Sequence, residues 1–320
     1  MRTARLGSSG PEISVIGFGA WEAGGDAWGP NPSEDRVLEA IRAGLDAGIG
    51  WIDTAEVYGD GTSVTLVGQA AAGRADEVLI ATKVAPRPDG TGFRADQVRR
   101  ACAASLERLG RERLDLYQLH WRDDEVPVEE TWGAMAELVD EGLVRHIGVS
   151  NFDRELIDRC ERIRHVDSLQ PHFSMLYLKH RDLIRWCGDQ GIGVVCYGPL
   201  AYGLLTEAIG PDTTFEPRDW RTGRGGVSYY REMFAPGKLE RSLAVVDALR
   251  PVADRRGITV AQLALAWVVH QPGVTAAIAG SRNPDHVRQN AGGGDVELEE
   301  DTLREIEAIL PLDPSAPVGS

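Results

Sequence analysis

The sequence has few cysteines and no long hydrophobic run, and each shortage excludes a class of protein. Its four cysteines, Cys102, Cys160, Cys187 and Cys196, are scattered without CxxC spacing or companion histidines, so they form no zinc or redox motif. No run approaches the roughly 20 apolar residues of a membrane helix, and the start MRTARLGSSG has no signal-peptide core. We therefore expect a cytoplasmic protein with buried, reduced thiols and no membrane partner.

Positive charge is scarce, and two common site motifs are missing. The chain has 34 basic against 49 acidic residues and a net charge of −15, which argues against nucleic acid or an anionic membrane as a partner. GFGAWEAGG contains Gly17 and Gly19 but no third glycine, so the dinucleotide fingerprint of Rossmann domains is absent. No HxH pair or ligand-spaced cluster supports a metal-dependent barrel hydrolase or isomerase, so we expect no metal.

Three apolar runs in the first 120 residues each end on a reactive polar group. GWIDTAEVYG presents Asp53 and Tyr58, EVLIATKV presents Lys83, and LDLYQLHW presents His120. In a barrel of alternating strands and helices, catalytic groups project from the C-terminal ends of the strands. Each residue alone has an ordinary explanation, as a turn, a solvated lysine or a structural histidine. Together, at successive strand ends, they predict one shared active site.

The four side chains suit proton donation to a carbonyl. A free phenol has a pKa of about 10, and lowering it by about 2 units requires roughly 3 kcal/mol of preferential anion stabilisation. We expect Lys83 to supply that stabilisation to Tyr58, with Asp53 neutralising the buried ammonium. His120 can donate a hydrogen bond to a substrate oxygen in the same cavity.

The rest of the chain alternates strands and helices. Residues 3–19 predict a hairpin at a barrel floor that runs into a first barrel strand ending at Gly19. The strands are apolar runs, so both of their faces should be covered, as in a parallel barrel. The pattern predicts an α/β fold, a (β/α)8 TIM barrel, as one domain over 1–310 with a flexible tail at 311–320. Further strands are expected at 50–53, 78–83, 115–119, 144–149, 167–170, 193–197 and 275–279, and helices at 33–47, 62–73, 94–109, 128–141, 153–163, 179–190, 239–255, 283–291 and 298–309.

At these residues the chain resembles the aldo-keto reductases. Asp53-Thr54-Ala55, Tyr58-Gly59, Lys83 and His120 match the family's tetrad, and the likeness continues through GLVRHIGVSNF, SLQPHF, YGPLAYGLL and AIAGSRNPDHVRQN. The resemblance implies an oxidoreductase that reduces an aldehyde or ketone with NADPH. In it Tyr58 is the general acid, Lys83 and Asp53 tune that acid, and His120 orients the carbonyl.

The resemblance also implies where an extended nicotinamide cofactor binds. Ser150, Asn151 and Gln170 would hold the carboxamide, and Tyr197 would lie beneath the ring. Side-chain amides and hydroxyls match the donors and acceptor of a carboxamide, and an aromatic face leaves the other side of the ring open. The further cofactor-binding positions implied are Gly19, Ala20, Trp21 and Asp53, with Gly198, Leu200, Gly203 and Leu205 along the pyrophosphate.

The segment that begins at Gly280 bears on cofactor choice. Gly280, Ser281 and Arg282 lead from the last strand into a helix N-terminus, where free amides favour a phosphate and an arginine adds a forked cation. We therefore expect NADPH over NADH, the alternative being an ordinary Asn-capped helix with a surface arginine. Unlike the family pattern, the adenine end has His286 and Gln289 beside Asn290, so NADH as a secondary cofactor stays open.

Residues 206–237, after the seventh strand, form the longest irregular stretch and a candidate lid on the catalytic face. Its aromatics either wall the substrate or anchor the loop; they are Phe215, Trp220, Tyr229, Tyr230 and Phe234. With Trp21 and Trp121 they suit a small carbonyl or a sugar. Two alternatives stay open: a cofactor-sensing regulatory subunit, like the potassium-channel β subunits of this fold, and an enzyme that runs as a sugar or alcohol dehydrogenase. The oligomeric state is not specified by the sequence.

Overall fold

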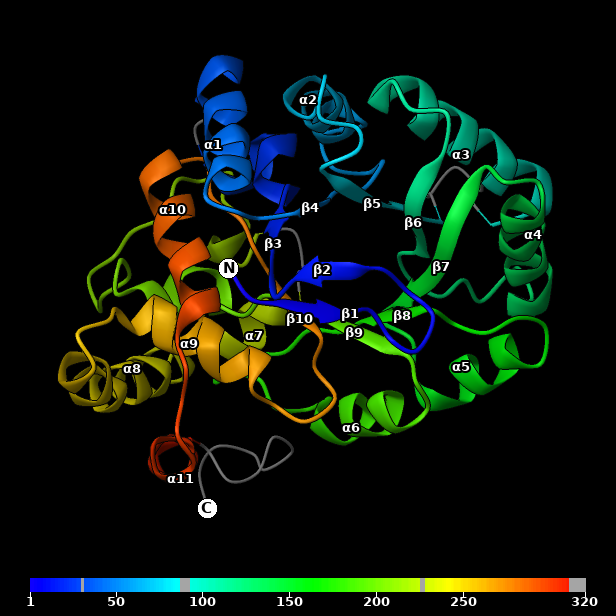
Figure 1. The fold of residues 1–320 in the computed structure, drawn as a ribbon. Helices are drawn as coiled ribbons and strands as arrows, with labels where there is room; N and C mark the ends of the chain where they lie inside the picture. The colour runs from blue at the N-terminus through cyan, green and yellow to red at the C-terminus, as the bar shows by residue number, and fades with distance from the viewer. Residues whose placement is uncertain (30–31, 87–92, 225–227, 311–320) are drawn as a thin grey trace.

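A closed parallel barrel surrounded by helices forms the molecule in the computed structural model, which describes residues 1–29, 32–86, 93–224 and 228–310 (Figure 1). Within these residues eight strands close in chain order, because the last, β10, pairs with the first, β3. This confirms the (β/α)8 fold. The barrel strands are β3 (Ile16–Gly19), β4 (Trp51–Asp53), β5 (Leu79–Val84), β6 (Leu114–Leu119), β7 (Val144–Ser150), β8 (Ser168–Gln170), β9 (Gly193–Tyr197) and β10 (Ala276–Ala279).

A short antiparallel hairpin closes the N-terminal end of the barrel, as the sequence predicts. Its strands β1 (Thr3–Arg5) and β2 (Glu12–Ser14) lie across the barrel mouth that faces the viewer in Figure 1. Leu6 and Ile13 of the hairpin join a small interior cluster with Trp51 and other inward-facing strand residues. Ser14 fastens the hairpin, because its carbonyl accepts a hydrogen bond from Trp51 Nε1 at 2.8 Å. The site must therefore lie at the opposite end.

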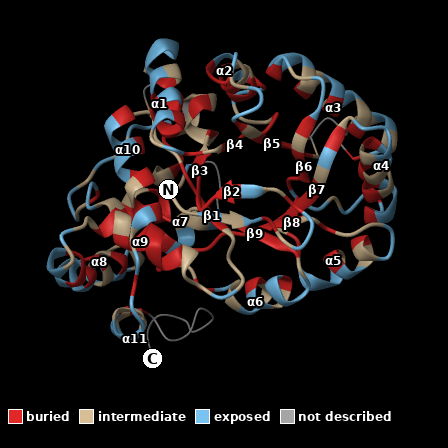
Figure 2. Cartoon of the chain, in the orientation of Figure 1, coloured by how far each residue is buried: buried red, intermediate tan, exposed pale blue. Residues whose placement is uncertain are grey.

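The helices pack their apolar faces on the barrel and expose their polar faces, so burial in Figure 2 runs from a red interior to a pale blue rim. Several begin at side-chain caps: Ser33 accepts from the Arg36 amide, Asp153 from Leu156, and Asn283 from Asp285. The predicted helices are confirmed with shifted ends: α1 (Glu34–Asp46), α2 (Thr62–Ala70), α3 (Ala95–Leu109), α4 (Val128–Asp140), α5 (Arg154–Glu161), α6 (Arg181–Asp189), α8 (Lys238–Arg255), α10 (Pro284–Gly292) and α11 (Glu300–Ile309).

Two helices were not predicted. α9 (Val260–Val269) is almost entirely buried, so it lacks the polar face that marks a surface helix. Its start nevertheless carries a capping box, in which the Thr259 hydroxyl accepts from the Gln262 amide and the Gln262 side chain accepts from the Thr259 amide. α7 (Ser228–Met233) and the 3₁₀ turn η4 (Trp220–Thr222) lie within the stretch predicted as a loop. The predicted tail, 311–320, lies outside the described residues.

The four cysteines are buried, as expected, and their thiols are free in the structure. Three lie on α3, α5 and α6, and Cys196 lies on β9. Burial raises the pKa of the Cys102 and Cys160 thiols to about 12, so these thiols carry their protons at neutral pH. In the part of the chain that the structure describes, no helix has the length and apolar character needed to cross a membrane.

Candidate active site

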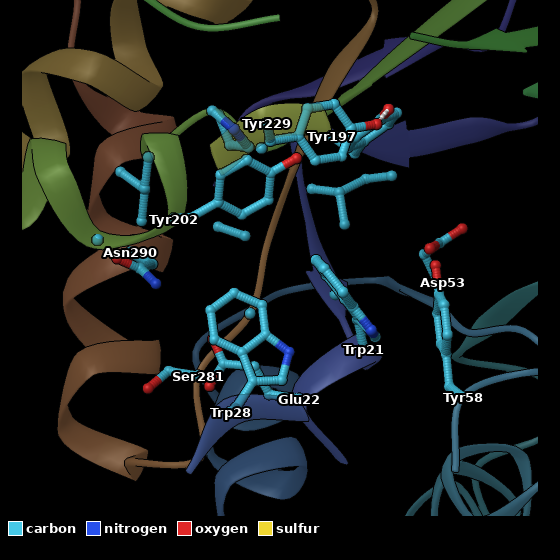
Figure 3. A pocket seen from close by; sticks show the side chains of 18 of the residues that line it. Trp21, Glu22, Trp28, Asp53, Tyr58, Tyr197, Tyr202, Tyr229, Ser281 and Asn290 are labelled. Carbon is cyan, nitrogen blue, oxygen red and sulfur yellow. Dashed lines mark hydrogen bonds between the residues drawn. The ribbon is translucent and has the colours of Figure 1, made fainter. Parts of the chain in front are cut away.

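A cavity of about 760 Å³ opens at the C-terminal ends of the barrel strands. Its lining comes from strand ends, from the start of α10 and from the stretch after β9. Figure 3 shows Asp53 and Tyr58 on one side, Ser281 and Asn290 on another, and Trp21 between Tyr58 and Trp28. The cavity therefore extends from the predicted proton donor to the predicted phosphate-binding helix.

Strand register brings Asp53 and Lys83 together. Asp53 is paired with Ala81 on the neighbouring strand, and Lys83 lies two residues further along, on the same face. Lys83 is fully buried, and its Nζ donates to Asp53 Oδ1 at 2.6 Å and to the Thr54 carbonyl at 2.9 Å. The same Nζ also donates a hydrogen bond to Tyr58 Oη at 3.3 Å. The lysine, placed behind the cavity wall, thus connects the carboxylate to the phenol.

Two glycines set the position of Tyr58. Gly59 has a φ of +61°, and a Cβ there would lie 2.0 Å from the Gly24 carbonyl oxygen. A Cβ on Gly24 would in turn lie 2.6 Å from the Tyr58 carbonyl carbon. Only glycine permits this approach of the turn after β4 to the 3₁₀ helix η1 (Trp21–Gly24). The contact holds the Tyr58 ring over the cavity.

The resting pKa of Tyr58 departs from the sequence-based expectation. Burial raises this pKa well above 10, and the Asp53 charge raises it further. The expectation of a lowered pKa is therefore wrong for the free site, because desolvation of a phenolate outweighs the lysine, whose charge Asp53 already balances. Tyr58 consequently holds its proton at neutral pH. The contact with Lys83 therefore stabilises the phenolate that remains when Tyr58 has lost its proton, rather than lowering the pKa of the resting phenol.

His120 completes the predicted group. Its Nε2 lies 3.5 Å from Tyr58 Oη, and its ring stacks on Trp121 with centroids 3.8 Å apart. Burial lowers the pKa of His120 well below 6.5, and Lys83 lowers it further, so the imidazole is neutral at pH 7. Nδ1 is buried without a hydrogen-bond partner among the described residues. A neutral ring that carries its proton on Nε2 can donate to an oxygen beside Tyr58.

The residues predicted to hold the carboxamide are linked to this group. Gln170 Nε2 donates to Asp53 Oδ2 at 2.8 Å, and Ser150 Oγ donates to the Gln170 carbonyl at 2.9 Å. Asn151 Nδ2 donates to the His120 carbonyl at 3.0 Å, and its Oδ1 accepts from the Tyr197 hydroxyl at 2.8 Å. These side chains and the Tyr197 ring line the cavity. Amides and hydroxyls therefore surround the space beside Tyr58.

At the other end, the start of α10 carries the predicted phosphate contacts. The Asn283 side chain caps this helix, and Ser281 Oγ accepts from the Asn283 amide at 3.1 Å. Gly280 allows the turn, because a Cβ there would lie 2.2 Å from the Gly19 carbonyl oxygen. Arg282 Nη2 donates to the Trp28 carbonyl at 2.8 Å. His286, Gln289 and Asn290 line the same end.

Most predicted site residues line this one cavity. Gly19, Trp21, Gly198, Leu200 and Gly203 do so, whereas Ala20 and Leu205 are buried and do not belong to its lining. Sequence reasoning did not name several lining residues, among them four that lie in short 3₁₀ turns: Glu22, Trp28, Tyr202 and Arg221.

The stretch after β9 both anchors itself and reaches the cavity. Trp220 is buried and stacks on Trp21 with centroids 6.0 Å apart, and Phe234 packs on Trp220. Tyr229 of α7 lines the cavity, and its hydroxyl hydrogen-bonds with that of Tyr197. Both roles left open by the sequence therefore occur: Trp220 and Phe234 anchor the segment, and Tyr229 lines the cavity.

Comparison with known proteins agrees with this architecture. The profile of the aldo/keto reductase family matches residues 15–311. The aldo-keto reductase YhdN of Bacillus subtilis is 35% identical over 327 residues, covering 100% of this chain and 96% of the relative. The glycerol dehydrogenase AKR11B4 of Gluconobacter oxydans superposes with a TM-score of 0.85 at 31% identity, over 98% of each chain. An aldo-keto reductase of Klebsiella pneumoniae in complex with NADPH gives a TM-score of 0.77 at 32% identity, again over 98% of each chain. Since these matches span nearly all of a barrel whose rim carries the Asp53, Tyr58, Lys83 and His120 group, the protein belongs to the aldo/keto reductase family.

Proposed function

We propose that the protein is an NADPH-dependent oxidoreductase that reduces a small aldehyde, ketone or sugar to the alcohol, with Tyr58 as the proton donor. The observation that carries the proposal is the buried chain of contacts from Asp53 through Lys83 to Tyr58, with His120 3.5 Å from the same phenol oxygen. Carbonyl reduction requires one proton at the oxygen and one hydride at the carbon. This group provides for the proton.

The residues of the cavity fit a nicotinamide dinucleotide. Ser150, Asn151 and Gln170 supply amide and hydroxyl groups beside Tyr58, and Tyr197 supplies an aromatic face. Small residues and the N-terminus of α10 line the other end, where phosphates are favoured. When bound there, the reduced nicotinamide supplies the hydride. Arg282 at that helix start favours NADPH over NADH, with NADH as a secondary cofactor.

The chain's own residues account for the proton transfer. Tyr58 carries its proton in the resting site because burial raises its pKa, and an alkoxide forming at the substrate is basic enough to take it. Lys83 then stabilises the phenolate across its 3.3 Å contact. Asp53 keeps that lysine charged by pairing with it in the interior. His120, neutral and beside Tyr58, orients the substrate oxygen.

A second candidate is the reverse reaction, oxidation of a small alcohol or polyol. The Gluconobacter oxydans neighbour is a glycerol dehydrogenase, and the same residues serve both directions, because the phenolate form of Tyr58 can accept the proton that the alcohol releases. The substrate supply and the ratio of oxidised to reduced cofactor then decide the direction.

A panel of substrates separates these functions. Aldehydes, ketones and aldoses are mixed with NADPH or NADH, and glycerol and other polyols with the oxidised cofactors, while the absorbance of the reduced nicotinamide is followed. We expect turnover of carbonyls, faster with NADPH. Turnover of polyols alone would favour the dehydrogenase. Tight NADPH binding with no turnover of any substrate would contradict both and favour a cofactor-sensing regulatory subunit.

A further inference from the structure

The phosphate end of the cavity contains an acidic side chain that proton transfer does not use. Glu22 lies in η1, directly after Trp21, and lines the same cavity end as Arg282 and His286. Its Oε2 lies 3.8 Å from Arg282 Nε, and 26% of its side chain is exposed. The carboxylate therefore faces the arginine that is predicted to contact the cofactor phosphate.

The cations around Glu22 come from two other parts of the fold. Arg282 lies just before α10, and Arg221 belongs to η4. Burial raises the pKa of Glu22, and the charges of these two arginines lower it. Arg221 is itself paired with Asp219, to which its Nη2 donates at 2.6 Å and its Nε at 2.9 Å. Each of the two arginines that line the cavity in the described chain thus faces a carboxylate. A phosphate group that binds to either arginine must therefore share it with a carboxylate.

We infer that Glu22 is a specificity-determining residue that competes with the 2′-phosphate of NADPH for Arg282. This inference rests on the proposed function. A phosphate dianion that approaches the Arg282 guanidinium is repelled by the carboxylate already there, whereas the 2′-hydroxyl of NADH carries no charge to repel. Glu22 therefore weakens the binding of NADPH but not that of NADH, and so reduces the preference for NADPH over NADH that Arg282 creates.

Binding of two nucleotide fragments tests the inference without turnover. Calorimetry measures the Kd of 2′,5′-ADP and of 5′-ADP for the native protein and for Glu22→Gln, which removes the charge but keeps the size of the side chain and one acceptor oxygen. We expect 2′,5′-ADP to bind roughly tenfold more tightly to the variant and 5′-ADP to change by less than about twofold. The gain should shrink as salt is added, because the repulsion is screened.

Asp285→Asn is the matched control. Asp285 lies on the same helix start, three residues from Arg282, but its side chain is 85% exposed and pairs with Arg288. Its removal changes the net charge by the same amount, so we expect neither fragment's Kd to change by more than about twofold. A comparable gain in this control would show that net charge alone is responsible and would overturn the inference.

The remaining outcomes separate this inference from the proposed function. Fluorescence titration with whole NADPH and NADH shows independently whether the native protein and the variant bind the cofactor. If NADPH binds but Glu22→Gln tightens both fragments equally, or neither, the role of Glu22 is refuted and the proposed function stands. If no nucleotide binds to the native protein or to the variant, the proposed function fails and this inference fails with it.

Discussion

Replacing Asp53 by asparagine removes the counter-charge of a lysine that has no access to water. Both oxygens of Asp53 accept hydrogen bonds, from Lys83 Nζ at 2.6 Å and from Gln170 Nε2 at 2.8 Å. An asparagine has one acceptor oxygen, so its NH₂ group must face one of these two donors. Breaking one side of a buried ion pair typically costs about 3–5 kcal/mol. We expect Asp53→Asn to lower the free energy of unfolding by that amount.

Urea denaturation followed by tryptophan fluorescence, without nucleotide, measures this loss. Since burial already lowers the pKa of Lys83, losing Asp53 lowers it further, and the loss of stability should shrink as the pH rises and Lys83 deprotonates. The double variant Asp53→Asn, Lys83→Met should be more stable than Asp53→Asn alone, because it leaves no uncompensated charge. A loss below about 1 kcal/mol, or a double variant less stable than the single one, would refute this account of the pair.

Three further changes test other parts of the structure. Gly280→Ala places a Cβ 2.2 Å from the Gly19 carbonyl oxygen, so β3 and β10 must separate; we expect a loss of about 2 kcal/mol or more in urea denaturation, and a neutral result would contradict the close approach. Thr259→Ala removes the cap of α9 and should cost about 1 kcal/mol, whereas an unchanged midpoint would mean that the cap contributes nothing. Burial lowers the pKa of His172 from 6.5 to about 3. Between these pH values only the unfolded chain takes up this proton, so the free energy of unfolding should fall as the pH is lowered from 6.5 to about 3. His172→Phe should flatten part of that fall, and identical pH slopes for the two proteins would exclude the effect.

The reactive side chains were predictable because each lies at the end of an apolar strand. Runs such as LIATKV must be buried on both faces, and parallel strands of one barrel end at the same rim, so Asp53, Lys83 and His120 had to meet. The caps of α1, α5 and α10 follow from the local sequence for a similar reason.

Other features depend on contacts between distant segments that leave no local pattern. Glu22 lies in a single 3₁₀ turn, and its meeting with Arg282 is set by the pairing of β3 with β10. The raised pKa of Tyr58 depends on how completely the loops bury it, which the strand pattern does not specify. α9 lacks a polar face because both sides are covered, so periodicity did not reveal it.

The rate of hydride transfer in Tyr58→Phe tests the proposed role of the phenol most directly. Rapid mixing of the NADPH-loaded enzyme with a carbonyl from the panel follows a single turnover, and fluorescence titration gives the Kd for NADPH. We predict an unchanged Kd, within about twofold, and a turnover slowed by at least about a hundredfold, because only the proton donor is lost. A single-turnover rate equal to that of the native enzyme would contradict the assignment of Tyr58 as the acid.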